Sequence, residues 1–280
     1  MTARERVDLH GSENTMLMTL YVRAVDAGSR HPVLGDPTAR AVLDRIAYDP
    51  WRLRLFRGNL PALVARARLL DERVQAYLDR HDDAVVVHLA CGLDGRSARL
   101  ALPPTVTWFD LDQPEVVDLR RRLYPELPGV TMIAGSATNP SWWAQVPPGR
   151  PTLVVAEGLL MYLDRAGLTA ALTPVITRPG PTTLMADTVA SWVRRAASGP
   201  LVSRALGAGF ASTSGDVDRV LRALAQPGRA APRLVEDVAV AEVARRWTHG
   251  ADKLATTAAD LVPGVRGAMR VRVWEIAAVG

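Results

Sequence analysis

The sequence predicts an α/β protein in which a helical N-terminal segment precedes a mostly parallel β-sheet. Three observations support this fold class. Residues 1–80 carry helix-type apolar spacing without a strand signal, short β-branched runs alternate with helical segments from residue 84 onward, and the first of these runs leads into a loop of small residues. Alternating strands and helices build βαβ units, whose strands lie parallel. We expect a helical cover over 1–80 and a sheet domain over 81–280.

Three helices are expected in the cover, over 16–25, over 38–46 and from about residue 59, where Asn59 is a suitable N-cap. The third helix carries an apolar stripe that begins at Leu63. At about 100° per residue, Arg66 lies roughly 60° from Leu63 and Arg68 roughly 140° away. Only Arg66 can therefore point into a covered cleft, unless it extends from the helix edge into water.

Five apolar runs in the second domain are typical of buried parallel strands. They cover residues 84–89, 105–109, 130–133, 152–155 and 182–185. A ligand site is expected at the carboxyl ends of such strands, where the strand order reverses. The region near 195–230, which contains a Gly/Ala/Ser-rich stretch at 205–215, is predicted to be either a flexible lid or a variable substrate-side insertion. The last run, 269–276, alternates polar and apolar residues as an antiparallel, half-exposed edge strand does.

Small residues and acids follow these strands. The first strand leads into Ala90-Cys-Gly92-Leu-Asp-Gly, a relaxed glycine loop in which Ala90 holds the first glycine position and lets the backbone approach a ligand. The second strand ends in Asp110-Leu-Asp112, and Asp112 is placed to bridge two ribose hydroxyls, whereas Asp110 is a structural candidate. Together they indicate a nucleoside-containing cofactor without saying which one.

A third acid, Glu157, ends the fourth strand and is expected to face the same crevice. A carboxylate there suits a cationic amino-acid group better than the phosphates of a dinucleotide. The helix after Asp112 has Arg120-Arg-Arg122 in its last turn, where the helix dipole favours cations. We interpret these three arginines as a solvated face.

Composition narrows the classes of function. The net charge of +5 rests almost wholly on dispersed arginines, since Lys253 is the only lysine, and this argues against a clustered nucleic-acid face. The single cysteine, Cys91, excludes an internal disulfide, and five scattered histidines show no metal-ligand spacing. We expect no metal. Without a signal-type or membrane-spanning apolar stretch, we also expect a cytoplasmic location and no membrane partner.

Six segments in this order resemble the leucine carboxyl methyltransferase superfamily, in particular its bacterial polyketide-tailoring group. They are Thr15-Met-Leu-Met-Thr-Leu-Tyr-Val-Arg-Ala, Asp36-Pro-Thr-Ala, Ala65-Arg-Ala-Arg-Leu-Leu-Asp, His88-Leu-Ala-Cys-Gly-Leu-Asp-Gly-Arg, Trp108-Phe-Asp-Leu-Asp-Gln-Pro-Glu-Val and Ala156-Glu-Gly-Leu-Leu-Met-Tyr-Leu. The resemblance covers most of the chain and is carried by the combination rather than by any one segment.

The resemblance implies a class I methyltransferase with a Rossmann-like, seven-stranded, mostly parallel sheet and S-adenosylmethionine as cofactor. It implies that Arg66 holds the cofactor carboxylate, that Asp112 holds the ribose and that Glu157 accepts from the ammonium group. Ser136, where the family often has Asp, and the backbone of Ala137 would border the adenine. The C-terminal third departs most from the family pattern, so the acceptor is not identified.

The expected reaction is O-methylation of a small-molecule acid in polyketide or peptide tailoring. A carboxylate is ionised at pH 7 and needs no general base, whereas a phenol usually needs one. No histidine sits in a recognisable catalytic segment, which favours a carboxylate, although His31 or Tyr162 could serve a phenol. A non-catalytic cofactor-binding protein is a further alternative. A nicotinamide-dependent dehydrogenase is disfavoured because no Tyr-x-x-x-Lys pair is present. A homodimer is left open.

Overall fold

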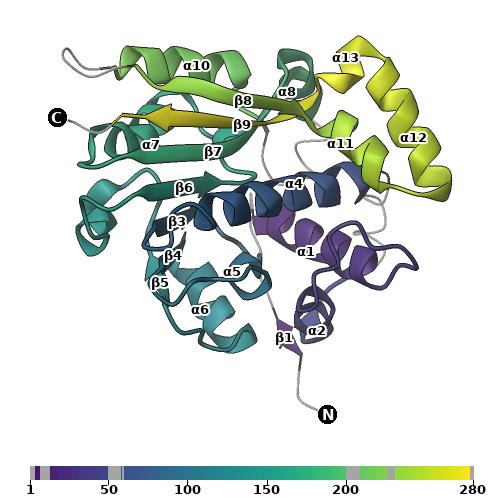
Figure 1. Ribbon diagram of the computed structural model, residues 1–280. Helices are drawn as coiled ribbons and strands as arrows, with labels where there is room; N and C mark the ends of the chain where they lie inside the picture. The colour runs from purple at the N-terminus through teal and green to yellow at the C-terminus, as the bar shows by residue number, and fades with distance from the viewer. Residues whose placement is uncertain are drawn as a thin grey trace.

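The computed structural model describes residues 4–6, 13–49, 58, 60–199, 209–225 and 231–277. Within these residues, seven strands form one sheet in the order β5-β4-β3-β6-β7-β9-β8 (Figure 1). The strands are β3 (Val85–Leu89), β4 (Thr107–Asp112), β5 (Val130–Ala134), β6 (Thr152–Ala156), β7 (Thr182–Val189), β8 (Arg233–Ala239) and β9 (Met269–Ile276). β9 runs antiparallel to both of its neighbours, β7 and β8, and the other pairs of this sheet are parallel. The predicted seven-stranded, mostly parallel sheet is therefore confirmed.

The strand order reverses next to β3. From β3 the chain continues outward through β4 to β5 on one side, and then crosses to β6 and β7 on the other. A parallel sheet leaves a crevice at the carboxyl ends of the strands at such a reversal. The loops that follow β3 and β6 therefore open into the same crevice.

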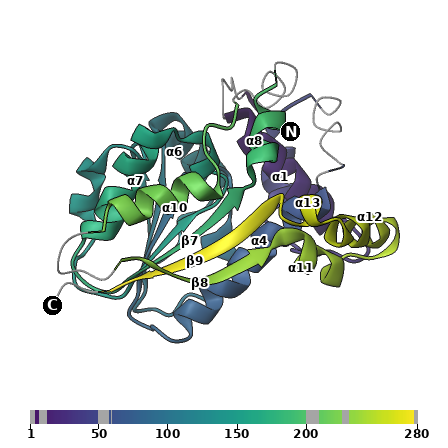
Figure 2. The same ribbon diagram turned by 90° about the horizontal axis from the view of Figure 1, so that it is seen from above.

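Helices cover both faces of the sheet, as the view from above shows (Figure 2). On one face lie α7 (Arg165–Thr177) and α10 (Ser214–Ala223), and on the other lie α4 (Leu60–Leu78), α6 (Pro114–Leu123) and α11 (Val240–Trp247). Successive side chains of β3 point to opposite faces, so Val85 belongs to the first core and Val86 to the second. Both faces are apolar, which explains the continuous apolar runs in the sequence.

The N-terminal segment contains α1 (Glu13–Ala27) and α2 (Ala39–Asp44) besides α4, and all three share the core of the α4 face. It also contains two strands that the sequence did not predict, β1 (Glu5–Arg6) and β2 (Ile46–Ala47), which pair in parallel. Strands of two residues carry no periodicity that could reveal them. The expected N-cap Asn59 lies outside the described residues.

The C-terminal strand is antiparallel as expected, but its placement at the sheet edge is wrong. β9 lies between β7 and β8, so β8 is the edge strand. The polar residue Arg272 of β9 is buried, because its guanidinium pairs with Asp218 and lies over the Trp274 ring. The alternation of polar and apolar residues in β9 therefore reflects an internal ion pair. The exposed edge strand is β8, which the sequence pattern did not predict.

The remaining described elements are α5 (Arg96–Arg99), α8 (Ser191–Ala197), α12 (Gly250–Leu261), α13 (Pro263–Arg266) and the 3-10 turns η2 (Pro140–Gln145) and η3 (Leu160–Tyr162). Of the segment near 195–230, residues 200–208 and 226–230 lie outside the described part of the chain. No helix in the described ranges has the length and apolar character needed to cross a membrane.

Candidate functional site

A cavity of about 960 Å³ opens at the carboxyl ends of β3, β4, β5 and β6. It has two parts with different linings. The strand-end half is lined by the loops that follow these strands, including residues 90–94, Asp112, 135–138 and Glu157, together with Arg66. The helical half is lined by residues of α8, α11, α12 and α13 and by Tyr162, Phe210 and Met269. The crevice expected from the strand order is therefore a real cavity.

The loop after β3 depends on left-handed backbone. Ala90 has φ 50°, the only positive φ outside glycine in the described residues, and Gly92 has φ 53°. A Cβ on Gly92 would lie 3.1 Å from Cγ of Met16, so α1 closes directly over this loop. Ala90 and Gly92 thus occupy the turn that the glycine pattern predicted, with their backbone facing the cavity.

Asp112 at the end of β4 holds this loop. Its Oδ2 accepts a hydrogen bond from the Gly92 amide at 2.6 Å, and its Oδ1 accepts one from the Gln113 amide at 2.8 Å. Burial raises the pKa of Asp112 above its ordinary value, despite these two amide donors. Each carboxylate oxygen can accept a second bond. Asp112 can therefore support the loop and still accept from a ligand hydroxyl.

Asp110, two residues earlier, has a structural role, because it contacts other side chains of the protein. It accepts from Trp108 Nε1 at 2.7 Å and pairs with Arg120 at 2.7 Å. Arg120 is 2% exposed and also donates to the carbonyl oxygens of Gly92 and Asp94. The solvated face predicted for residues 120–122 is therefore wrong for Arg120, because its face of α6 packs against the glycine loop.

Arg66 reaches the cavity from α4 and is held by two carboxylates. Its Nε and Nη2 lie 3.0 and 2.9 Å from Oε1 of Glu157, and its Nη1 lies 2.8 Å from Oδ2 of Asp187. Arg68 instead pairs with Glu72 on the helix surface and lies over the Trp247 ring. This difference agrees with the helical phase, which put Arg66 toward the cleft and Arg68 away from it.

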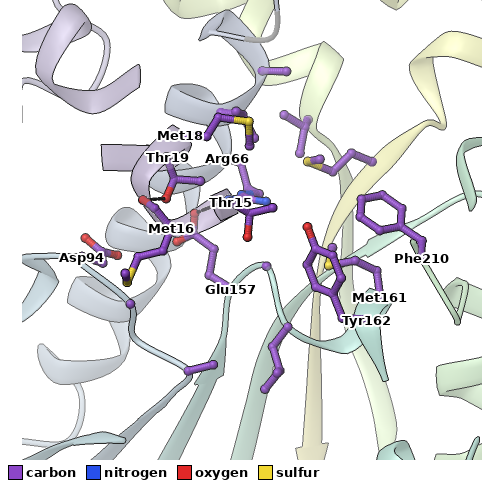
Figure 3. A pocket seen from close by; sticks show the side chains of 18 of the residues that line it. Thr15, Met16, Met18, Thr19, Arg66, Asp94, Glu157, Met161, Tyr162 and Phe210 are labelled. Atoms are coloured by element: carbon purple, nitrogen blue, oxygen red, sulfur yellow. Dashed lines mark hydrogen bonds and ion pairs between the residues drawn. The ribbon is translucent and has the colours of Figure 1, made fainter. Parts of the chain in front are cut away.

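Glu157 is shared between two arginines. Oε1 faces Arg66, and Oε2 lies 2.5 Å from Nη2 of Arg96, which is itself fully buried and pairs with Asp71 at 2.7 Å. Burial alone would raise the pKa of Glu157, but Arg66 and Arg96 lower it from 4.5 to about 2. Glu157 is consequently an anion at any physiological pH, placed where Arg66 and the cavity meet (Figure 3).

Ser136 and Ala137 follow β5 and line the far end of the strand-end half. The Ser136 hydroxyl is within hydrogen-bond distance of the Thr138 hydroxyl at 2.9 Å, and its carbonyl oxygen accepts from Trp142 Nε1 at 3.0 Å. The indole of Trp142 also packs behind Gly135. This turn is fixed by its own contacts, and it presents small groups to the cavity.

The helical half has little charge. Tyr162 and Phe210 meet edge to face with ring centroids 5.1 Å apart, on the side of the cavity away from Asp94 (Figure 3). Burial raises the pKa of Tyr162, so its phenol stays protonated and can donate. Among the described lining residues, Asp94, Asp112 and Glu157 are the only carboxylates, and none lies in the helical half.

His31 is not part of this site. Its ring is exposed on the loop after α1 and lies 4.9 Å from the ring of His249 at the start of α12. The one described histidine that lines the cavity is His88, which is buried beside Arg96 at the strand-end half. The prediction of His31 as an acceptor-side base is therefore wrong. Residues that could hold a metal ion do not cluster anywhere in the described ranges.

Two residues that organise the site were missed. Asp187 lies in β7, two residues before the strand ends at Val189, but the expected strand stopped at residue 185, so Asp187 fell outside it. Arg96 lies four residues after Gly92, and no local pattern distinguishes it from a surface arginine. Only the three-dimensional contacts of Arg96 with Asp71 and Glu157 reveal its place.

Comparison with known proteins shows which family the chain is similar to. Residues 16–131 match the family model described as leucine carboxyl methyltransferase. The tetracenomycin polyketide synthesis O-methyltransferase TcmP of Streptomyces glaucescens is 46% identical over 206 residues, which are 74% of this chain and 76% of that protein. The S-adenosyl-L-methionine-dependent methyltransferase dpfgK of Gibberella zeae is 38% identical over 175 residues, 57% of this chain and 59% of that protein.

Among solved structures, one described as a "possible exported protein" from Bordetella parapertussis aligns with a TM-score of 0.51. It covers 95% of this chain and 96% of that chain at 15% sequence identity. At this identity the likeness concerns the fold alone.

Proposed function

Because this chain belongs to the leucine carboxyl methyltransferase family and is an S-adenosylmethionine-dependent O-methyltransferase, we propose that it methylates the carboxylate of a small-molecule acid in polyketide biosynthesis. The observation that carries this proposal is the lining of the helical half. It contains no carboxylate and no histidine among its described residues, and its tyrosine is a proton donor. Such a chamber suits an anionic nucleophile that is already ionised.

The residues of the strand-end half fit the cofactor. Asp112 would hold the ribose hydroxyls, and the turn at Ser136 and Ala137 would border the adenine. Arg66 would bind the carboxylate of the amino-acid portion and Glu157 would accept from its ammonium group. The backbone at Ala90 and Gly92 allows the close approach that such a cofactor needs. A cavity of about 960 Å³ leaves room for an acceptor beside it.

The chain has little covalent chemistry to perform. S-adenosylmethionine supplies an electrophilic methyl group on a sulfonium sulfur. The protein has to orient the acceptor carboxylate in line with that group and remove its water. The apolar walls at Phe210 and Met269 would exclude water, and the Tyr162 hydroxyl would orient the acid by donating to one oxygen while the other attacks.

Three further expectations belong to the same proposal. We place the enzyme in the cytoplasm, where its cofactor is available, and expect neither nucleic acid nor membrane as a partner. Residues 1–80 act as the cover of a methyltransferase domain over 81–280, and the segment near 195–230 contributes to acceptor choice. A homodimer is compatible with this arrangement.

The test uses an acceptor that offers both nucleophiles. Hydroxynaphthoic acid carries a carboxyl and a phenol, and its methylated product would be identified by mass spectrometry before and after mild alkali. A methyl ester is cleaved by this treatment, whereas an aryl methyl ether survives it. We expect loss of the methyl group, turnover of naphthoic acid and none of naphthol. A product that keeps its methyl group in alkali would replace the carboxylate with a phenol as the acceptor.

A further inference from the structure

Asp187 lies just behind the cavity wall. It follows Ala186 in β7, which pairs in register with Ala156 of β6, so Asp187 stands beside the strand end that carries Glu157. The side chain of Asp187 is fully buried, and it is not among the residues that line the cavity. Whatever Asp187 contributes to the site must therefore act through its neighbours.

Both neighbours of the Asp187 carboxylate belong to the cavity wall. Oδ1 accepts from the backbone amide of Gly158 at 2.7 Å, and Oδ2 accepts from Nη1 of Arg66 at 2.8 Å. Gly158 has φ 65°, and a Cβ there would lie 3.8 Å from Nη2 of Arg66. One carboxylate therefore ties the turn after β6 to the guanidinium that α4 brings across the cavity.

Asp187 and Glu157 bind different N–H groups of the Arg66 guanidinium. Glu157 takes the edge made by Nε and Nη2 through a single oxygen, while Asp187 takes Nη1. An arginine has five N–H donors, so these contacts leave donors on Nη1 and Nη2 for another group. The other oxygen of Glu157 is engaged by Arg96, so without Asp187 only Oε1 of Glu157 would hold the guanidinium, which would be free to turn away from the cavity.

We propose that Asp187 is a positioning residue that keeps Arg66 turned toward the carboxylate of the amino-acid portion of the cofactor. The inference rests on the proposed function, in which Arg66 binds that carboxylate. Asp187 would then contribute to cofactor affinity without touching the cofactor. Its effect should be confined to ligands that carry the amino-acid portion.

Two ligands separate this role from a general structural one. S-adenosylhomocysteine carries the amino-acid portion, and methylthioadenosine has the same adenosine thioether without it. Asp187→Asn preserves the side-chain volume but removes the charge, and its amide can accept from only one of the two donors. Binding of both ligands to folded wild type and variant would be measured by titration calorimetry.

We expect the ratio of the two affinities in favour of S-adenosylhomocysteine to fall about tenfold in Asp187→Asn, as for the loss of one charge-assisted contact. The Kd of methylthioadenosine should stay within about twofold. Asp26→Asn is the matched control, because Asp26 is a buried carboxylate that accepts from the amides of Val33, Leu34 and Gly35 outside the cavity. Its affinity ratio should equal that of wild type.

Either of two results would overturn the inference. An unchanged ratio in a folded Asp187→Asn protein would show that Arg66 needs no help, and an equal loss for both ligands would make Asp187 a residue of the fold only. If Asp187→Asn does not fold, Asp187→Ser gives the same comparison with a smaller uncharged side chain. An Arg66→Met variant with an unchanged ratio would instead reject the proposed clamp itself, and the inference with it.

Discussion

The two halves of the cavity differ in how far their charged side chains are exposed to solvent. Around the strand-end half, the ion pairs are buried: the side chains of Arg66, Arg96, Arg99 and Arg120 are at most 6% exposed. In the helical half, Arg266 pairs with Glu242 but is 49% exposed. The first half is therefore a fixed electrostatic framework, and the second is an apolar chamber whose lining cation, Arg266, is half-exposed to water.

This difference indicates how well each half of the cavity tolerates amino-acid substitutions. A buried ion that loses its partner keeps a large desolvation cost, so each member of the network constrains the others. Exposed pairs contribute little, and replacement of small apolar residues changes shape rather than charge balance. Selection for a new acceptor can therefore reshape the helical half while the strand-end half keeps the same cofactor.

The largest effect is expected when the buried framework loses a cation. Arg96→Leu removes the partner that Asp71 and Glu157 share, and should lower the free energy of unfolding by about 3–5 kcal/mol. Urea unfolding measures this loss. Arg121→Leu, which removes an exposed partner of Asp118, should stay within about 0.5 kcal/mol of wild type. Similar losses in both variants would erase the distinction between buried and exposed pairs.

Asp112→Ala should affect the cofactor more than the fold. It removes the expected bonds to the ribose and the acceptor of the Gly92 amide, and two bonds to a charged group are worth about 1.5–3 kcal/mol each before compensation. The affinity for S-adenosylmethionine should fall roughly a hundredfold. Calorimetry beside the exposed-residue control Asp118→Ala would check it. Wild-type affinity in the Asp112 variant would remove this residue from the site.

Arg66 and Arg68 of α4 test the difference between an arginine of the site and an arginine of the surface. Arg66→Met should weaken S-adenosylmethionine binding by about tenfold, the value of one charge-assisted contact. Arg68→Met should leave it within about twofold, because Arg68 pairs with Glu72 on the outer side of the helix. Equal losses in two folded proteins would mean that Arg66 acts through the fold and not on the cofactor.

A charge change in the helical half should be milder and should reach only the acceptor. Arg266→Gln removes a half-exposed cation that pairs with Glu242 and Asp260, and such pairs are worth up to about 1 kcal/mol each. We expect kcat/KM for naphthoic acid to fall by at most about fivefold, with an unchanged Kd for S-adenosylmethionine. Steady-state kinetics and calorimetry on the same preparation measure both. A loss of cofactor affinity would show that the two halves are not independent.

The smallest change is expected with pH. A carboxylate acceptor with a pKa near 4 is fully ionised above pH 6. The pKa of Glu157 is about 2, and burial raises the pKa of Tyr162 above its ordinary value, so neither group titrates between pH 6 and pH 9. The kcat for naphthoic acid at saturating cofactor should vary less than about twofold in this range. A steady rise with pH would indicate a base or a phenolic nucleophile.

The sequence predicts the strand-end half far better than the helical half. Asp112 and Glu157 follow continuous apolar strands, and because parallel strands end at one edge, their convergence is readable in advance. Ala90 and Gly92 are readable because a tight turn restricts the residue types. The helical half offers no comparable rule, since an apolar face that lines a chamber has the same spacing as one that packs in a core.

The predictions from sequence are wrong mainly where a charged residue is buried instead of exposed to solvent. Arg120 and Arg272 were assigned to solvent by residue type, but both are buried in ion pairs that join distant segments. His31 was considered for catalysis because of its chemistry, and its position depends on packing that no local pattern encodes. Asp187 was missed because β7 extends four residues beyond the expected end at residue 185, and Asp187 lies within that extension.

The insertion of β9 between β7 and β8 also affects the order of assembly during synthesis. β7 forms a parallel pair with β6 along one edge, but its other partner is encoded some eighty residues later, at Met269–Ile276. Until that segment leaves the ribosome, β7 has an open edge of unpaired amides and carbonyls, which invites pairing with other chains. Such long-range pairing also slows folding. The interval between synthesis of β7 and synthesis of β9 is therefore one in which this protein is exposed to aggregation.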